Sequence, residues 1–423
     1  MAHVVTCFVR ERGQVLLTRR SDAVGTYRGH WAGVSGYVEG DPGSAKRDAW
    51  RELREETGLT RDDLAFVRAG ESLAVDDEES SFTVHPFLFE SDTRRVTPSE
   101  ELAALEWVDP TVIRSRRTVP RLWETWRRTG PTVETVRSDR THGSTWIGAR
   151  ALEALRDAAA DAEKWATVVA VARDLRDARS GMAAVRNRVN RVMNEASQSL
   201  DAVVERAISA LDASFDADSE AARTAADQLD ADGATRVATL SRSGTVRAAL
   251  ETADLDEVVV TESRPEREGV AVAEWAAETT SATVTVTTEA ALPSALATRD
   301  VDAVLVGADA VWPGGTVVNK TGSRILGLAA QEQGIPVFVA AARDKVVAAG
   351  SDADEAGVFA AEERSPPGSI YDGAADVEVH APAFETVPGG LVDGVATESG
   401  LVHREDVSQI AELHAEHARW DVE

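Results

Sequence analysis

The feature that most constrains the fold of this sequence is a regular alternation of strands and helices after Asp230. Helix-like stretches such as 269–279 and 321–332 separate five short, valine-rich apolar segments. These predicted strands are 237–240, 258–261, 284–287, 304–306 and 337–340. Strands that alternate with helices imply a parallel sheet with right-handed crossovers. In such a sheet, ligands bind beyond the carboxyl ends of the strands.

Polar and charged residues follow several of these strands. The chain has only four lysines, and two of them, Lys320 and Lys345, lie in these segments. Because lysine is avoided elsewhere, this placement favours a bound phosphate. A helix beginning near residue 321 would add backbone donors for the same anion. Other polar and charged residues in the segments that follow the strands are Ser241, Arg264, Asp309 and Asn319.

A second pattern lies near the N-terminus, in the segment Arg-Glu-Leu-Arg-Glu-Glu-Thr-Gly-Leu at residues 51–59. On a helix, Glu52, Glu55 and Glu56 stand at positions i, i+3 and i+4, so the three carboxylates share one face. Three carboxylates this close repel one another unless a cation lies among them. Hard oxygen ligands favour Mg²⁺ or Mn²⁺, and the backbone carbonyl of Gly36 is a candidate fourth ligand.

Residues 51–59 resemble the second half of the Nudix hydrolase box, Gly-x5-Glu-x7-Arg-Glu-U-x-Glu-Glu-x-Gly-U, where U is aliphatic. The first half departs from it, since Gly43 occupies the early Glu position and Asp41 is a possible substitute. The resemblance covers residues 1–128 and implies a mixed sheet between helices, including a helix over 111–128. It also implies cleavage of a nucleoside-diphosphate derivative, with one Glu of the helix or a later one, such as Glu101 or Glu106, as base.

The second half of the chain resembles the family that joins the alpha, beta and delta subunits of translation initiation factor 2B with two sugar-phosphate isomerases. The matching segments are Thr-Glu-Ser-Arg-Pro at 261–265 with Glu268-Gly269, Gly-Ala-Asp at 307–309, Asn-Lys-x-Gly at 319–322, 384–388 and 397–400. The isomerases act on ribose 1,5-bisphosphate and methylthioribose 1-phosphate. The resemblance implies a phosphorylated sugar or nucleotide as the ligand, contacted by Ser241, Arg264, Glu268, Asn319, Lys320 and Lys345, with Asp309 on its hydroxyl. The resemblance implies a helical subdomain, a Rossmann-like subdomain and a homodimer formed through the C-terminal domain.

This family's isomerases use a Cys in Thr-His-Cys-x-Ser and the Asp of Gly-Ala-Asp. Here the Asp is Asp309, but the Cys position holds Ser241 and the His position Leu240. A serine hydroxyl is a far weaker acid than a thiol and needs a base beside it. Two alternatives therefore stay open for this half: a regulatory module that binds its ligand without turnover, and an isomerase with an altered site.

Length and composition set the remaining expectations. A chain of 423 residues is too long to fold around a single ordinary core, so we expect several domains of the α/β class. These are a Nudix domain at 1–128, a linker at 129–142, a helical subdomain at 143–230 and a Rossmann-like domain at 231–423. A net charge of −27 disfavours general nucleic-acid binding, and such an acidic composition resembles that of halophilic proteins. One cysteine, no signal peptide and no long apolar run predict a cytoplasmic protein without a membrane span.

Overall fold

The structure is a computed structural model that describes residues 2–77, 81–179, 181–351, 356–357 and 364–421. The chain divides into two compact units. The first comprises Met1–Ser138, Ala149–Val171 and Gln198–Asp212, and the second comprises Asp139–Gly148, Ala172–Ser197 and Ala213–Glu423. Within the described ranges, no helix combines the length and the apolar character that crossing a membrane requires.

The first unit is built on an eight-stranded mixed sheet with the central order β3-β2-β1-β7-β5. Its strands are β1 (Ala2–Glu11), β2 (Gln14–Arg20), β3 (Trp31–Ala32), β4 (Val34–Tyr37), β5 (Leu64–Ala69), β6 (Leu73–Asp76), β7 (Ser81–Ser91) and β8 (Leu102–Val108). β1 runs parallel to β7 and antiparallel to β2 and β4. This arrangement confirms the expected α/β class with a mixed sheet.

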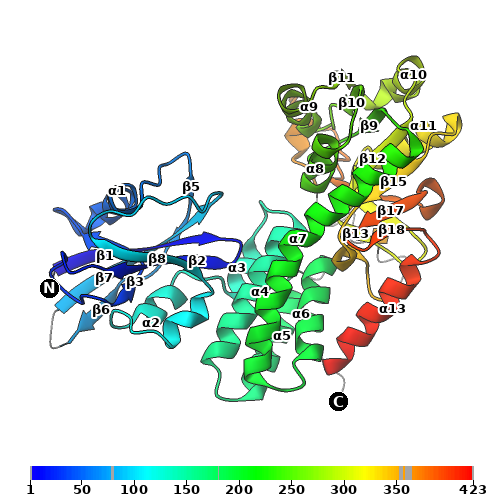
Figure 1. Cartoon of the computed structure of the whole chain (residues 1–423). Helices are drawn as coiled ribbons and strands as arrows, with labels where there is room; N and C mark the ends of the chain where they lie inside the picture. The colour runs from blue at the N-terminus through cyan, green and yellow to red at the C-terminus, as the bar shows by residue number, and fades with distance from the viewer. Residues whose placement is uncertain (1, 78–80, 180, 352–355, 358–363, 422–423) are drawn as a thin grey trace. The chain divides into compact units, whose positions relative to one another are not determined.

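The side chains of β1 contribute to two separate hydrophobic cores, because successive side chains of a strand point to opposite faces of the sheet. Val5, Cys7 and Val9 pack with helix α1 (Ala45–Thr57). Phe8 packs on the other face, against helix α2 (Leu122–Arg127). Figure 1 shows the two helices on opposite sides of the sheet. The sheet is therefore sandwiched between helices.

The prediction of one helix over 111–128 is wrong. The structure has a 3₁₀ turn at Pro110–Arg114 and then α2, which begins only at Leu122. Thr118, between them, bridges to Trp31 of β3. Pro120 lacks the N–H that a continuing helix needs, so the two helical pieces stay separate.

Buried ion pairs connect the sheet of the first unit to helix α4 (Ser144–Asp161). Arg10 of β1 is 1% exposed, and its guanidinium donates to Glu90 of β7 and, at 2.9 Å, to Glu153 of α4. The fully buried Arg156 contacts Asp109 at 2.7 Å and Asp157 at 2.8 Å. Each buried charge thus has an opposite charge within hydrogen-bonding distance, which is what makes such burial tolerable.

The segment that lies between the two sheets in the sequence is helical. It contains α4, α5 (Trp165–Ala178), α6 (Ala183–Glu195) and α7 (Leu200–Asp232). The predicted linker carries a short helix, α3 (Val133–Ser138). Helix α7 runs for 33 residues without Gly or Pro and ends before Gly233, whose φ of 68° suits the left-handed position after a helix.

The second unit contains a seven-stranded sheet of order β11-β10-β9-β12-β15-β17-β18. Its neighbours pair in parallel except for β18, which is antiparallel to β17. The strands are β9 (Arg236–Thr239), β10 (Glu257–Thr261), β11 (Thr283–Thr287), β12 (Ala303–Gly307), β15 (Val337–Ala340), β17 (Gly394–Thr397) and β18 (Gly400–Val402). All five strands expected from the apolar segments are present, and the parallel sheet is confirmed.

Helices and a small second sheet surround this parallel sheet. The helices are α8 (Gly244–Thr252), α9 (Glu268–Thr279), α10 (Leu292–Thr298), α11 (Ser323–Gln333) and α13 (Val407–His417). The small antiparallel sheet consists of β13 (Ala310–Val311), β14 (Val317–Lys320) and β16 (Phe384–Val387). The strand order reverses between β9 and β12, because the chain moves outward to β10 and β11 and then returns to the other side of β9. Ligands bind at such switch points in open α/β sheets.

Candidate functional site

The carboxylates of the first unit are presented by helix α1, which ends at Gly58 with a φ of 72°. Glu52 and Glu56 are buried beside the core residue Leu53, whereas the side chain of Glu55 is 50% exposed. The predicted spacing therefore places the three acids on one side of the helix, but at different depths. Two of them are removed from water, which makes their charges costly without a partner.

Gly36 of β4 lies directly against the Glu52 carboxylate. A Cβ added at Gly36 would lie 2.0 Å from the carboxyl carbon of Glu52. Any larger residue would push that carboxylate away, so this contact requires bare backbone. The pairing of β4 with β1, in which Gly36 stands opposite Val5, fixes the position of Gly36. The two residues predicted as ligands are thus adjacent in space.

The carboxylates in this region repel one another. Burial raises the pKa of Glu56 to about 8, and the charges of Glu52 and Glu101 add to the rise. Burial also raises the pKa of Glu52, although Arg51, whose Nη2 lies 2.9 Å from Glu52 Oε1, acts in the opposite direction. A bound cation would relieve this repulsion, so the chemistry of the donors fits a divalent metal.

A cavity of about 440 Å³ opens beside these residues. Gly36, Glu52, Glu55 and Glu101 line its acidic side, whereas Glu56 is not among its lining residues. Apolar and aromatic side chains also line the cavity, among them Val4, Val75, Phe82, Val84 and Tyr37, as do Arg20 and Arg51. In the described part of the chain, no three His, Cys, Asp or Glu side chains are grouped closely enough to hold a metal ion. The acids are near one another without forming a closed ligand set.

Asp48, which the sequence reasoning did not single out, supports the loop in front of α1. Its side chain is 1% exposed and accepts hydrogen bonds from the Glu39 backbone N–H at 3.2 Å and from Ser44 Oγ at 3.1 Å. Asp41 accepts from the Gly43 N–H at 2.7 Å and caps a 3₁₀ turn. The signal for Asp48 was an acid in the first turn of a helix, where the helix dipole favours negative charge.

The second unit has a larger cavity, of about 1040 Å³, at the switch point between β9 and β12. Segments that follow these two strands, 240–245 and 307–309, form part of its wall. Six of the predicted residues line it: Ser241, Glu268, Asp309, Asn319, Lys320 and Lys345. Arg264 is not among the lining residues; it is exposed, and its backbone N–H donates to Glu289 Oε1 at 3.3 Å.

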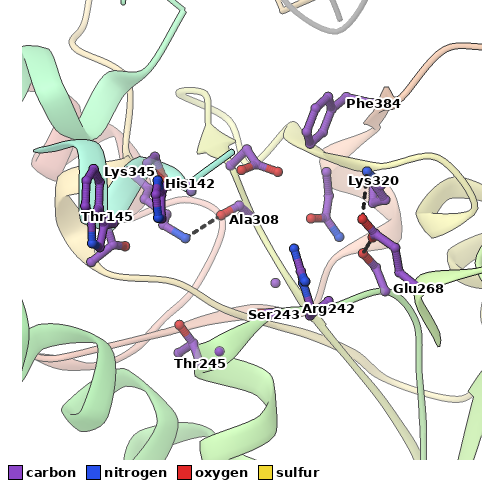
Figure 2. Close-up of a pocket in the computed structure, with 18 of the residues that line it drawn as sticks. His142, Thr145, Arg242, Ser243, Thr245, Glu268, Ala308, Lys320, Lys345 and Phe384 are labelled. Carbon is purple, nitrogen blue, oxygen red and sulfur yellow. Dashed lines mark hydrogen bonds and ion pairs between the residues drawn. The ribbon is translucent and has the colours of Figure 1, made fainter. Parts of the chain in front are cut away.

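Ser241, Glu268 and Lys320 form a connected chain in this cavity, and Figure 2 shows the contact between Glu268 and Lys320. Ser241 Oγ donates to Glu268 Oε2 at 2.9 Å, and Lys320 Nζ lies 3.3 Å from Glu268 Oε1. The backbone N–H of Ser241 donates to Ser263 Oγ at 2.7 Å, and Ser241 adopts a φ of 59°. A serine in this left-handed conformation is strained, and such strain concentrates at functional sites.

Lys345 reaches the cavity from the side opposite Lys320 (Figure 2), and its Nζ donates to the Ala308 carbonyl at 2.7 Å. Helix α6 fixes this part of the chain. Asn187 donates to the backbone carbonyls of Asp344 at 2.9 Å and Val346 at 2.7 Å, on both sides of Lys345. The geometry of Lys345 therefore depends on a helix about 150 residues earlier in the sequence.

Asp344 itself is a buried ion-pair centre. Arg188 Nε lies 2.9 Å from its Oδ2 and Arg191 Nη1 lies 2.6 Å from its Oδ1. Burial alone would raise the pKa of the Asp344 carboxyl, but these two arginines hold that pKa well below its usual range. Asp344 is therefore ionised at neutral pH. Its ion pairs connect the 3₁₀ turn Arg343–Lys345 to α6.

Several cavity residues were missed from the sequence. The segment 140–146 forms one wall, where the rings of His142 and Trp146 stack with centroids 3.8 Å apart. Nδ1 of His142 lies 2.8 Å from Asp139 Oδ2. Arg140, Arg242, Arg364 and Phe384 also line the cavity. Segment 140–142 falls in the predicted linker, which carries no strand or helix signal, so only the tertiary fold reveals its place.

The backbone donors expected to bind an anion at the start of α11 already have a partner. The N–H groups of Gly322 and Arg324 donate to Glu385 Oε1 at 2.6 and 2.9 Å. Glu385 reaches them from β16, which pairs with β14 so that Asn319 stands opposite Glu385. The carboxylate of the chain itself thus occupies the position predicted for a ligand anion, and the cations of the cavity wall are the groups left for a phosphate.

Comparisons with known proteins confirm the family resemblance of both halves of the chain. The model of the NUDIX domain matches residues 1–128, and that of the initiation factor 2 subunit family matches residues 140–404. A probable bifunctional methylthioribose-1-phosphate isomerase/methylthioribulose-1-phosphate dehydratase of Nocardia farcinica is 35% identical over 38% of this chain and 29% of its own length. The methylthioribose-1-phosphate isomerase of Pseudomonas syringae pv. tomato is 31% identical over 40% of this chain and 48% of its own length. The chain thus spans about half or less of these curated relatives.

Solved structures show the same fold. The translation initiation factor eIF-2B of Pyrococcus horikoshii matches with a TM-score of 0.52 and 25% identity, over 64% of this chain and 95% of that one. The 5-methylthioribose 1-phosphate isomerase of the same organism matches with a TM-score of 0.52 and 20% identity, over 75% and 90% of the two chains. With its parallel sheet, its switch-point cavity and a family match over more than half of its length, the chain belongs to the initiation factor 2 subunit family and carries a Nudix domain in front of it.

Proposed function

We propose that the first domain is a Mg²⁺- or Mn²⁺-dependent hydrolase that cleaves a phosphoanhydride bond in a nucleoside-diphosphate derivative. The observation that carries this proposal is the pair of buried, mutually repelling carboxylates, Glu52 and Glu56, beside the bare backbone of Gly36. Acids in such a position are costly for stability, and perturbed acids of this kind concentrate at functional sites.

Glu52, Glu55 and Glu56, with the Gly36 carbonyl, are the groups that would hold the metal. When bound, the metal supplies neutralisation of the diphosphate charge and activation of a water molecule. Glu101 lines the same cavity and is a second candidate, beside the helix acids, for the general base. The apolar and aromatic side chains of the cavity, with the exposed ring of Tyr37 near Phe82, suit the base or the sugar of a nucleoside.

The second domain, in our proposal, binds a phosphorylated sugar or a nucleotide. Its cavity carries Lys320 and Lys345, which Figure 2 shows on opposite sides, together with Arg140, Arg242 and Arg364. Five cations in one cavity of a chain whose net charge is −27 favour an anionic ligand. The fusion suggests that the hydrolase releases a phosphosugar that the second domain senses or converts. We also propose a cytoplasmic, halophilic homodimer formed through this domain.

The decisive experiment measures phosphate or nucleotide release from a panel of nucleoside-diphosphate compounds, with Mg²⁺, in high salt. Glu55→Gln is the variant, because Glu55 is half exposed and its exchange for the isosteric amide leaves the core intact. Glu71→Gln, at a side chain 95% exposed and outside the cavity, is the matched control. We expect metal-dependent turnover in the wild type and the control, and a loss of about a hundredfold or more in Glu55→Gln.

A second candidate function is a non-catalytic regulatory module of the initiation factor type. Gly43 at the early acid position of the Nudix box and Ser241 at the Cys position favour it. Wild-type protein that is folded and binds its phosphorylated ligand, but hydrolyses no compound of the panel, would establish this second function. Equal turnover by wild type and Glu55→Gln would refute the assignment of the metal ligands.

A further inference from the structure

Ser241 poses a chemical problem for any reaction in the second cavity. Moving a proton from carbon requires a base, and a serine hydroxyl is a much weaker acid and a poorer proton carrier than a thiol, whose ordinary pKa is about 8.5. If the cavity catalyses proton transfer, another group has to accept the proton. The structure holds one in direct contact with Ser241.

That group is Glu268, at the first position of α9. Its Oε2 accepts the hydrogen bond from Ser241 Oγ at 2.9 Å, and its Oε1 lies 3.3 Å from Lys320 Nζ. Figure 2 shows the Glu268 carboxylate pointing toward Lys320 in the cavity. Its side chain is 21% exposed, so it is held by neighbours and still open to a ligand. A carboxylate held in this way is a competent base for a proton on a carbon next to a carbonyl.

The backbone around Glu268 is held in an unusual geometry. Ser241, Ser263 and Arg267 all adopt φ values near 60° without being glycine. Gly269 lies so close to the end of β10 that an added Cβ would be 1.8 Å from the Thr261 carbonyl oxygen. Three strained residues in one hydrogen-bonded cluster indicate that the position of this carboxylate is maintained at a cost in stability.

We propose that Glu268 is the general base of a proton-transfer reaction on an open-chain phosphorylated hydroxycarbonyl sugar, with Ser241 as the residue that positions its carboxylate. This inference rests on the proposed binding of a phosphorylated sugar in the same cavity. Glu268 removes the proton from the hydroxyl-bearing carbon next to the carbonyl, and the electron pair moves to the carbonyl oxygen to give an enediolate. Lys320 stabilises that negative charge.

The reaction needs no further reactant, because the proton that Glu268 removes is returned to the substrate. Glu268 returns the proton to the former carbonyl carbon, while the hydroxyl proton moves from the oxygen of the second carbon to that of the first. Asp309 lines the same cavity and serves this oxygen-to-oxygen transfer. The product is an isomer of the substrate with its carbonyl on the neighbouring carbon, so an aldose phosphate and a ketose phosphate interconvert.

Two measurements on the full-length protein test the inference, with ribose 5-phosphate and ribulose 1,5-bisphosphate as probes in high salt. Calorimetric titration measures binding, and NMR in D₂O measures deuterium incorporation at the carbon next to the carbonyl. The variants are Glu268→Gln, which retains a hydrogen-bond acceptor for Ser241, and Ser241→Ala. Glu278→Gln, at an exposed acid on the same helix outside the cavity, is the control.

We expect the control Glu278→Gln to bind the probe within about threefold of the wild type, and the loss of exchange in Glu268→Gln to be much larger than any loss of binding. Glu268→Gln should lower exchange by about a hundredfold or more, the range of general-base catalysis, and the control should not change it. Ser241→Ala should lower the exchange rate by about tenfold without a matching loss of binding, and Ser241→Thr, which keeps the hydroxyl, should restore it.

The possible failures are distinguishable. Exchange by Glu268→Gln at the wild-type rate, or a loss in Ser241→Ala larger than in Glu268→Gln, would overturn the role of Glu268. Binding of a probe by the wild type without exchange would overturn the reaction but leave the proposed binding function standing. Failure of both probes to bind would overturn the binding function and this inference together.

Discussion

Replacing Asp344 by Asn tests whether helix α6 holds the Lys345 segment in place. The substitution keeps the shape of the side chain but removes the only negative charge within salt-bridge distance of Arg188 in the described residues. The Arg188 side chain is 0% exposed and that of Arg191 is 25% exposed, so Arg188 loses more. Breaking a buried pair by removing one partner costs about 3 to 5 kcal/mol, because an uncompensated charge remains.

The assay is urea unfolding in high salt, followed by circular dichroism, with thermal melts beside it. A loss of this size lowers the melting temperature by on the order of 10 °C for a domain of this size. The control is Arg188→Met, alone and combined with Asp344→Leu. The double variant removes the charges of Arg188 and Asp344 and should recover the part of the stability that an unpaired Arg188 costs, since two apolar groups need no counter-charge. The smaller loss from Arg191, whose side chain is 25% exposed, remains in both variants.

Two outcomes would refute this reasoning. The first is a free energy of unfolding of Asp344→Asn within about 0.5 kcal/mol of the wild type, which is the ordinary range of a surface substitution. The second is a double variant as unstable as the sum of the single ones, which would mean that the two charges do not depend on each other. A lower ligand affinity at Lys345 in Asp344→Asn, measured by titration, would support the link between α6 and the cavity.

Three further predictions follow from described contacts. Because the pKa of Asp344 is lowered from its ordinary 3.8, its contribution to stability is present above about pH 4 and is lost as pH falls through the lower pKa of the folded state. Urea midpoints between pH 3 and 7 should therefore fall more steeply in the wild type than in Asp344→Asn. Gly36→Ala should lower kcat/KM of the hydrolase by about a hundredfold while the protein stays folded, because the new methyl displaces Glu52. Asp48→Ala should cost about 1 to 3 kcal/mol in urea unfolding and speed hydrogen exchange at the Glu39 amide, which loses its acceptor; unchanged exchange would contradict the loop role of Asp48.

The parallel sheet was predictable because each of its buried strands is a short apolar run between helix-like stretches. β12, for example, is buried at every position from Ala303 to Gly307, as expected for a strand covered on both faces. The helix expected over 111–128 was not found, because Pro120 and the bridge from Thr118 to Trp31 compete with helix propensity. Local propensity loses where a strand partner comes from a distant part of the chain.

The site was predictable where its residues follow strands. Ser241 and Asp309 come directly after β9 and β12, and the switch point brings those strand ends together. Other residues gave little or no signal. His142 lies in a polar stretch, and the signal of Asp48, an acid in the first turn of a helix, is shared by many helices. Arg264 follows a strand as well, but the chain turns there so that the residue faces solvent.

The pairing of Arg10 with Glu153 has a consequence for modularity. Recombination between genes can exchange domains freely only where few interactions cross the joint. A break after residue 128 would keep the whole Nudix sheet, yet it would remove Glu153 from Arg10 and Arg156 from Asp109. We therefore expect the part of the chain that folds on its own to be longer than residues 1–128, the segment that the NUDIX domain model matches. Recombination therefore has to transfer this Nudix domain together with the helices that follow it, and a single break directly after the domain does not reverse the fusion.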